Sequence, residues 1–121
     1  MNPLYIAKIY DSVINMDFSY LNAISDGDEE FIKEFVSTFE TNNNSILAEM
    51  QVGLNSGDFD KLGKLAHQLK PTIEMLGMKE TLVLVSRINN EPSSASQEDL
   101  DFVQNKSLEA LEALKSEFNI S

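Results

Sequence analysis

Apolar residues recur at intervals of three and four along most of this 121-residue chain, the spacing of one face of an α-helix. The longest run begins at Asp28, in an acidic first turn that suits a helix N-terminus, and continues to Leu54. Its weak point is residues 42–45, poor helix formers that predict a bend or a division into two helices. Residues 82–85 alone resemble a buried strand, but no second strand segment exists to pair with them. Residues 79–90 are therefore also predicted to be helical.

Glycine, proline and capping residues predict where the other helices begin and end. Asp17 is expected to cap a short helix that ends in the turn 25–27, and Ser56-Gly57-Asp58 combines a stop with a new cap. The helix that follows keeps its apolar stripe through Pro71, so we expect one kinked helix that ends at Gly77. Residues 91–97 read as a loop, in which Ser94 with Gln97, or Ser96 with Asp99, forms a capping box for the last helix.

These segments predict an all-α protein, an antiparallel four-helix bundle with one or two additional short N-terminal helices. Residues 1–16 are assigned to an N-terminal extension, which Asn2 and Pro3 could open as a helix.

Composition excludes several kinds of chemistry. The net charge of −11 argues against nucleic-acid binding and against an anionic membrane surface. With no cysteine and one histidine, the chain lacks the ligands of the common zinc and iron–sulfur sites. No apolar run approaches the roughly 20 residues of a membrane span, and no signal peptide is recognisable. We expect a cytoplasmic protein without a cofactor of its own.

The single histidine, His67, is predicted to face solvent. At about 100° per residue, the apolar stripe of its helix centres on Leu62 and Leu69, whereas His67 lies on the opposite side. Lys70 follows one turn later, and Gly63, one turn earlier, is expected to leave the approach to the imidazole open. Residues 61–79 carry four lysines and one glutamate, a cationic patch on an acidic protein that would suit a phosphate.

Spacing alone does not assign a function to His67. An exposed histidine among lysines is by composition an ordinary surface residue. No nucleophile or orienting carboxylate lies at motif spacing, which disfavours an enzyme that uses His67 as a base. From these features the chain would be an acidic helical bundle and nothing more.

The run from Ala66 to Met78 resembles the signature of histidine-containing phosphotransfer (HPt) domains, in which Ala-His is followed by Lys after three residues and Gly after ten. Residues 17–21, 27–31 and 57–58 match further landmarks in the same order, so the resemblance spans roughly residues 17–118 and makes 17–121 the HPt-like domain.

The resemblance implies a phosphorelay intermediate that carries a phosphoryl group between the aspartates of response-regulator receiver domains. His67 would be the phosphoacceptor and Lys70 the cation that neutralises the phosphate. The residues around His67 on the same helix are predicted to form a partner-docking surface, made of Gly63, Lys64, Gln68, Pro71 and Glu74.

The expected protein is a monomeric phosphoryl carrier without kinase or phosphatase activity, since neither a P-loop nor a kinase glycine-rich motif is present. Its partners would be receivers, which supply the Mg²⁺, and a hybrid sensor kinase. Pro71 and Glu74 depart from the commonest HPt pattern. The family usually has glycine directly after the lysine, where this chain has Pro71, and more often a small or neutral residue where this chain has Glu74. The alternative function is a non-phosphorylated helical adaptor that binds a receiver or another signalling partner.

Overall fold

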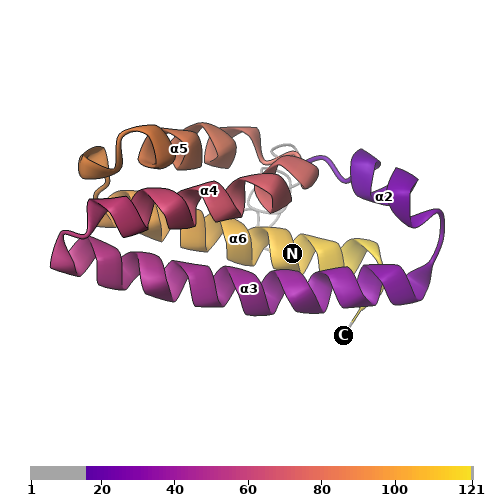
Figure 1. Ribbon diagram of the computed structural model, residues 1–121. Coiled ribbons are helices and arrows are strands. Elements are labelled where there is room, and N and C mark those ends of the chain that lie inside the picture. The colour runs from indigo at the N-terminus through magenta and orange to yellow at the C-terminus, as the bar shows by residue number, and fades with distance from the viewer. Residues whose placement is uncertain (1–15, 121) are drawn as a thin grey trace, which may run out of the picture.

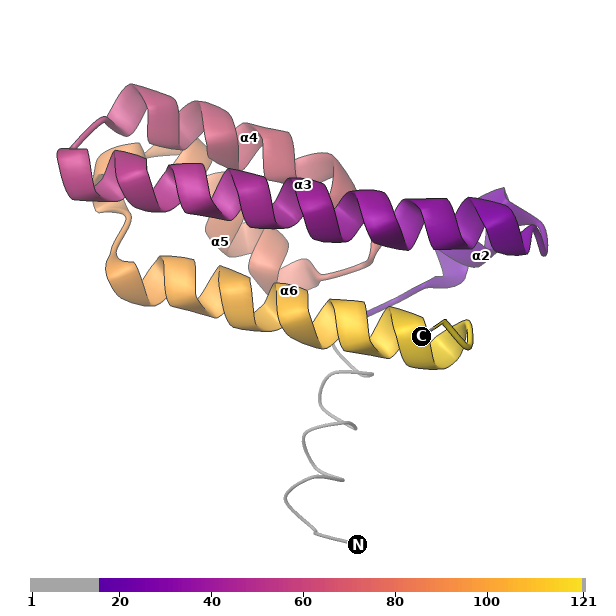
Figure 2. The same cartoon turned by 90° about the horizontal axis from the view of Figure 1, so that it is seen from below.

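The computed structural model describes residues 16–120, and this part of the chain is all-helical and contains no strand. The elements are α2 (Ser19–Ser25), α3 (Glu29–Ser56), α4 (Phe59–Met75), α5 (Lys79–Asn90), the short 3₁₀ helix η1 (Pro92–Ser94) and α6 (Gln97–Glu117). Helices α3 to α6 lie lengthwise beside one another, and α2 lies at the end where α3 begins (Figures 1 and 2). The predicted helical bundle with a short additional helix is confirmed, whereas the predicted N-terminal helix lies outside the described residues.

The helix boundaries follow the predicted caps. The Asp28 carboxylate accepts hydrogen bonds from the N–H groups of Glu30 and Phe31, at 3.0 and 3.2 Å. Asp58 accepts from the N–H of Lys61 at 3.1 Å, directly after a left-handed Gly57. These bonds satisfy N–H groups that have no partner inside the helix.

The caps of α6 and α2 also involve residues that the sequence predicted. Of the two predicted boxes, the one formed is Ser96 with Asp99, at the start of α6. Asp17 accepts from the N–H of Ser19 at 2.9 Å and so caps α2 from one residue further out than expected.

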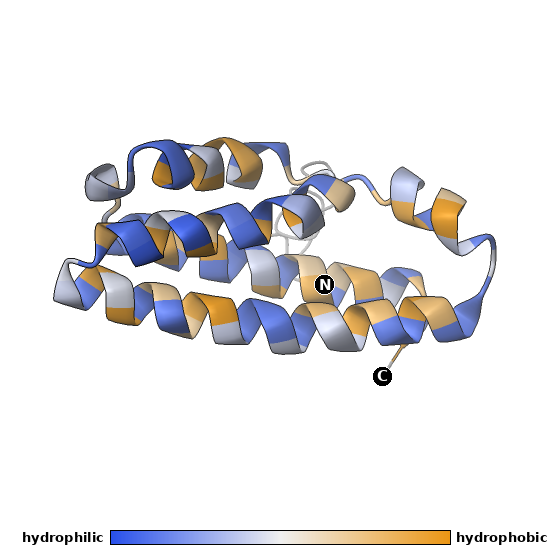
Figure 3. Ribbon diagram, viewed as in Figure 1, coloured by the Kyte–Doolittle hydropathy of each residue, from blue (hydrophilic) through white to orange (hydrophobic). Residues whose placement is uncertain are grey.

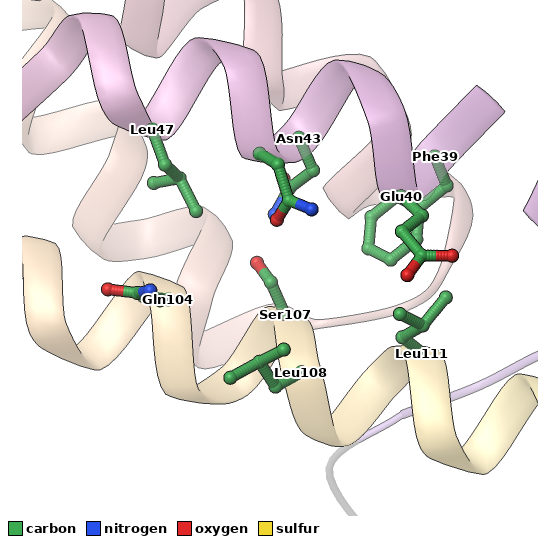
Figure 4. A pocket seen from close by; sticks show the side chains of 9 residues that line it. Phe39, Glu40, Asn43, Leu47, Gln104, Ser107, Leu108 and Leu111 are labelled. Carbon is green, nitrogen blue, oxygen red and sulfur yellow. The ribbon is translucent and has the colours of Figure 1, made fainter. Parts of the chain in front are cut away.

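Of the two alternatives predicted for residues 42–45, a bend or a division, the division does not occur, because α3 continues as one helix for 28 residues. Within the polar run Asn42 and Asn44 are exposed, but Asn43 is buried against α6. Its amide points toward the hydroxyl of Ser107, which is buried as well (Figure 4). Packing against α6 outweighs the low helix propensity of this segment.

The core fills the space between the four long helices, and α4 contributes its entire inner face. That face consists of Leu62, Leu65, Ala66, Leu69 and Ile73, none more than 5% exposed. The outer surface of the same helix is mostly hydrophilic (Figure 3). The apolar stripe therefore fixes the rotation of α4 about its axis, and with it the direction of every polar residue on the helix.

The end of α4 is held by a close crossing of the chain. Gly77 has a φ of +64°, and a Cβ atom at this position would lie 2.6 Å from the Cβ of Asp17. The N–H of Asp17 donates to the carbonyl of Leu76 at 3.0 Å. A glycine ten residues after the histidine therefore serves the fold, since it lets the segment before α2 cross the end of α4.

Candidate functional site

His67 lies in the middle of α4 with its side chain exposed, as predicted. Its helix neighbours Ala66 and Leu69 are almost fully buried and hold the backbone in place. A side chain on a rigid helix is presented to a partner in one orientation, and His67 lines neither of the two pockets found among residues 16–120. The chemistry that this geometry permits is attack by the imidazole on a group brought by another molecule.

Lys70, one turn after His67, is half-buried and forms no ion pair with any residue from 16 to 120. Glu74, one further turn along, is exposed and is likewise not paired with it within this range. The ammonium group of Lys70 is therefore available for a phosphoryl group on the imidazole.

The cationic patch is smaller than the sequence predicted. Lys64 Nζ lies 3.0 Å from Asp60 Oδ2, an exposed pair one helical turn apart. Asp60 lies just outside the window over which the lysines were counted. Lys64 and Lys70 are both three residues from His67. Because Lys64 is paired, Lys70 is the one of these two lysines that has no ion pair among residues 16–120.

Gly63 does not lie where it was expected. It is buried, and a Cβ atom there would lie 2.9 Å from Pro92 Cγ and 3.3 Å from the carbonyl oxygen of Asn89. The glycine allows α5 and η1 to approach α4 closely. The expectation that Gly63 leaves the approach to the imidazole open is therefore wrong.

Two residues near the site were not predicted from the sequence, Asn89 and Pro92. Both pack against Gly63 of α4, one turn before His67. Arg87 holds the segment that contains Pro92 in place. Its Nη2 lies 2.9 Å from an Asp99 carboxylate oxygen, and its Nη1 donates to Ser94. A glycine inside a helix was the available signal of such a close approach.

The other predicted docking residues, Gln68, Pro71 and Glu74, are exposed on α4 together with Lys64. The helix passes through Pro71 as a single element, as predicted from its apolar stripe, and ends at Met75, two residues before the predicted stop at Gly77. Their roles in docking stay predictions.

Other features contribute no chemistry at His67. The described helices contain no cluster of three or more side chains suited to a metal ion, and none is long and apolar enough to cross a membrane. Hydrogen bonds from Ser19, aided by the charge of Lys79, hold the pKa of the Asp17 carboxyl below its ordinary value. Asp17 belongs to the crossing at the end of α4, so this shift concerns the fold.

Comparison with known proteins gives one match. A family model, the Hpt domain, matches residues 34–117, which extend from the first half of α3 to the end of α6 and include the whole of α4. The matched range begins later than residue 17, where the resemblance was expected to start. No curated protein and no solved structure matches the chain significantly. Because the model covers well over half of the sequence, the chain belongs to the Hpt domain family.

Proposed function

We propose that this protein is a histidine phosphotransfer protein of a two-component phosphorelay, which accepts and donates a phosphoryl group through His67. The observation that carries the proposal is an exposed imidazole in the middle of α4, with Lys70 one turn away and without an ion pair to any residue from 16 to 120. Hpt domains act in two-component signalling as phosphocarrier modules rather than as enzymes, and their partners are receiver domains.

In the proposed reaction an imidazole nitrogen of His67 attacks the phosphorus of an aspartyl phosphate in a receiver. The nitrogen–phosphorus bond forms as the bond from phosphorus to the aspartate oxygen breaks, and the aspartate leaves as a carboxylate. The proton on the other ring nitrogen passes to water. The reverse sequence delivers the phosphoryl group to a second receiver. Alignment and charge neutralisation supply most of the catalysis in such transfers.

Lys70 contributes the charge neutralisation that this chain can offer. Its ammonium group would donate to phosphoryl oxygens as their charge develops, and no carboxylate among residues 16–120 competes for it through an ion pair. The receiver supplies the Mg²⁺ in this proposal, and the protein described here needs no cofactor.

The finer features of the proposal concern how the protein works in the cell. We propose an antiparallel four-helix bundle that acts as a cytoplasmic monomer, exchanges phosphate with receivers and with a hybrid sensor kinase, and has no kinase or phosphatase activity of its own. One exposed face of α4 then suffices for every partner.

The test is incubation of the protein with phosphorylated receivers from the same organism, scored for transfer of label. Wild type should gain label that is lost in acid and stable in alkali, as expected for a phosphoramidate, and His67→Gln should gain none. Label of this kind on the variant, or none on wild type from any receiver, would leave the non-phosphorylated adaptor as the better explanation.

A further inference from the structure

Pro71 is the least expected residue on the outer face of α4. It lies four positions after His67, its side chain is exposed, and the helix continues past it to Met75. Proline has no N–H group, so it cannot donate the usual helical hydrogen bond to the carbonyl of His67.

Packing gives no reason for this proline. The inner face of α4 is filled by its neighbours Leu69 and Ile73, which are 2% and 1% exposed. An exposed proline in a helix interior lowers helix stability, and residues that break a local rule without a structural gain tend to lie at functional sites. The consequence of Pro71 for the surface is an acceptor, the His67 carbonyl, that its usual helical donor does not satisfy.

Glu74 adds a second acceptor to the same surface. Its exposed carboxylate lies seven residues after His67, two turns along the same face, and it forms no ion pair with a residue between 16 and 120. Helix carbonyls point toward the C-terminus, so the His67 carbonyl is directed toward the turn that carries Pro71 and Glu74. Along the helix, the His67 carbonyl thus precedes Pro71 and Glu74 follows it on the same exposed face.

We propose that the His67 carbonyl and the Glu74 carboxylate form a subsite for a basic side chain, lysine or arginine, of the docking receiver. The inference rests on the proposed function and adds a feature of the partner, a cation beside the donating aspartate. A cationic side chain complements both acceptors, and its alkyl stem can pack on the apolar ring of Pro71. Pro71 and Glu74 are then specificity-determining residues.

The opposite role for Glu74 makes a competing prediction. If its charge merely repels the phosphate, removing the charge should speed transfer. If it binds a basic side chain of the receiver, removing the charge should weaken docking and make it less sensitive to salt.

The experiment compares Pro71→Ala, Glu74→Gln and the double variant with wild type. Transfer rates are measured over a range of concentrations of a phosphorylated receiver, at low and high salt. Glu112→Gln is the matched control, because it removes the same charge from an exposed site on α6. Direct labelling with phosphoramidate, which needs no receiver, reports separately whether the His67 imidazole is still reactive.

Each single variant should raise the half-saturating receiver concentration by about 3- to 10-fold, with phosphoramidate labelling unchanged. In the double variant the half-saturating concentration should rise by less than the product of the two single-variant factors, since both acceptors bind one group. Pro71→Ala should at the same time raise the thermal midpoint, because it restores a helical N–H donor.

Half-saturating concentrations equal to that of Glu112→Gln, or faster transfer by Glu74→Gln, would overturn this inference while leaving the proposed function in place. No label on wild type from any receiver, despite labelling by phosphoramidate, would instead overturn the proposed function.

Discussion

Helices α3 and α4 both carry residues that disfavour a helix, and both continue unbroken, for different reasons. In α3 the polar run is held by packing inside the molecule, because the core residues Phe39 and Met50 flank it and Asn43 is buried where α3 faces α6 (Figure 4). In α4 the exception is Pro71, which is exposed and lies one turn after the candidate phosphoacceptor. An unfavourable residue with an internal neighbour is explained by packing, whereas one on the surface is better explained by a partner.

The same contrast separates stability from function. Substitutions in the interior or at tight crossings of the chain should change the free energy of unfolding, while substitutions on the outer face of α4 should change phosphoryl transfer. Pro71 is the one expected exception, because its substitution also restores a helical N–H donor. Any other residue whose substitution changed both would break the comparison.

The largest expected effect is that of His67→Gln, which should abolish phosphate uptake from a receiver. Because the side chain is exposed, the thermal midpoint should stay within about 2 °C of wild type. Acid-labile label and thermal unfolding, measured on the same preparation, check the two halves of this prediction. A midpoint that fell by several degrees would mean that the imidazole also supports the fold.

Gly77→Ala should have the opposite profile and lower the free energy of unfolding by about 2–4 kcal/mol. The backbone has positive φ there, and a Cβ would overlap Asp17 at 2.6 Å. Gly57→Ala is the matched control, with φ +71° but nothing within 4 Å of the added Cβ, and should cost only about 1 kcal/mol. Equal losses in urea denaturation would show that the crossing at Asp17 yields easily.

Lys70→Ala should slow transfer by about tenfold, the value of roughly one charge-assisted hydrogen bond, with little change in stability. Lys61→Ala, which removes the same charge from the same helix, is the control and should change the rate less than about twofold. Rates are compared at matched receiver concentration and salt. Identical rates for the two variants would remove Lys70 from the site.

Local rules identified most of the fold from the sequence. The caps at Asp28, Asp58 and Ser96 were identifiable because capping is a contact between near neighbours in the chain. The exposure of His67 was predictable because the apolar stripe fixes the rotation of α4.

Two of the three failures involve contacts between distant segments. Asn43 keeps α3 intact through α6, and Gly63 serves the approach of Pro92. The positive charge near His67 is smaller than residues 61–79 alone suggest, because Asp60, the residue just before them, pairs with Lys64. Propensity and periodicity do not specify which surface an element will meet, so tertiary packing decided the cases of Asn43 and Gly63.

The smallest expected effect tests the interior side of the comparison. The Ser107 hydroxyl is buried and, within the described structure, has no hydrogen-bond partner beside a cavity of about 10 Å³. Ser107→Ala removes an unsatisfied polar group, so the free energy of unfolding should stay constant or rise by up to about 1 kcal/mol, without any change in transfer rate. Ala110→Ser, at a fully buried position one turn along α6, should lower the free energy of unfolding by about 1–3 kcal/mol. A loss of more than about 1 kcal/mol in Ser107→Ala would show that the hydroxyl is bonded in solution, for which one ordered water in the cavity beside Asn43 is the simplest partner.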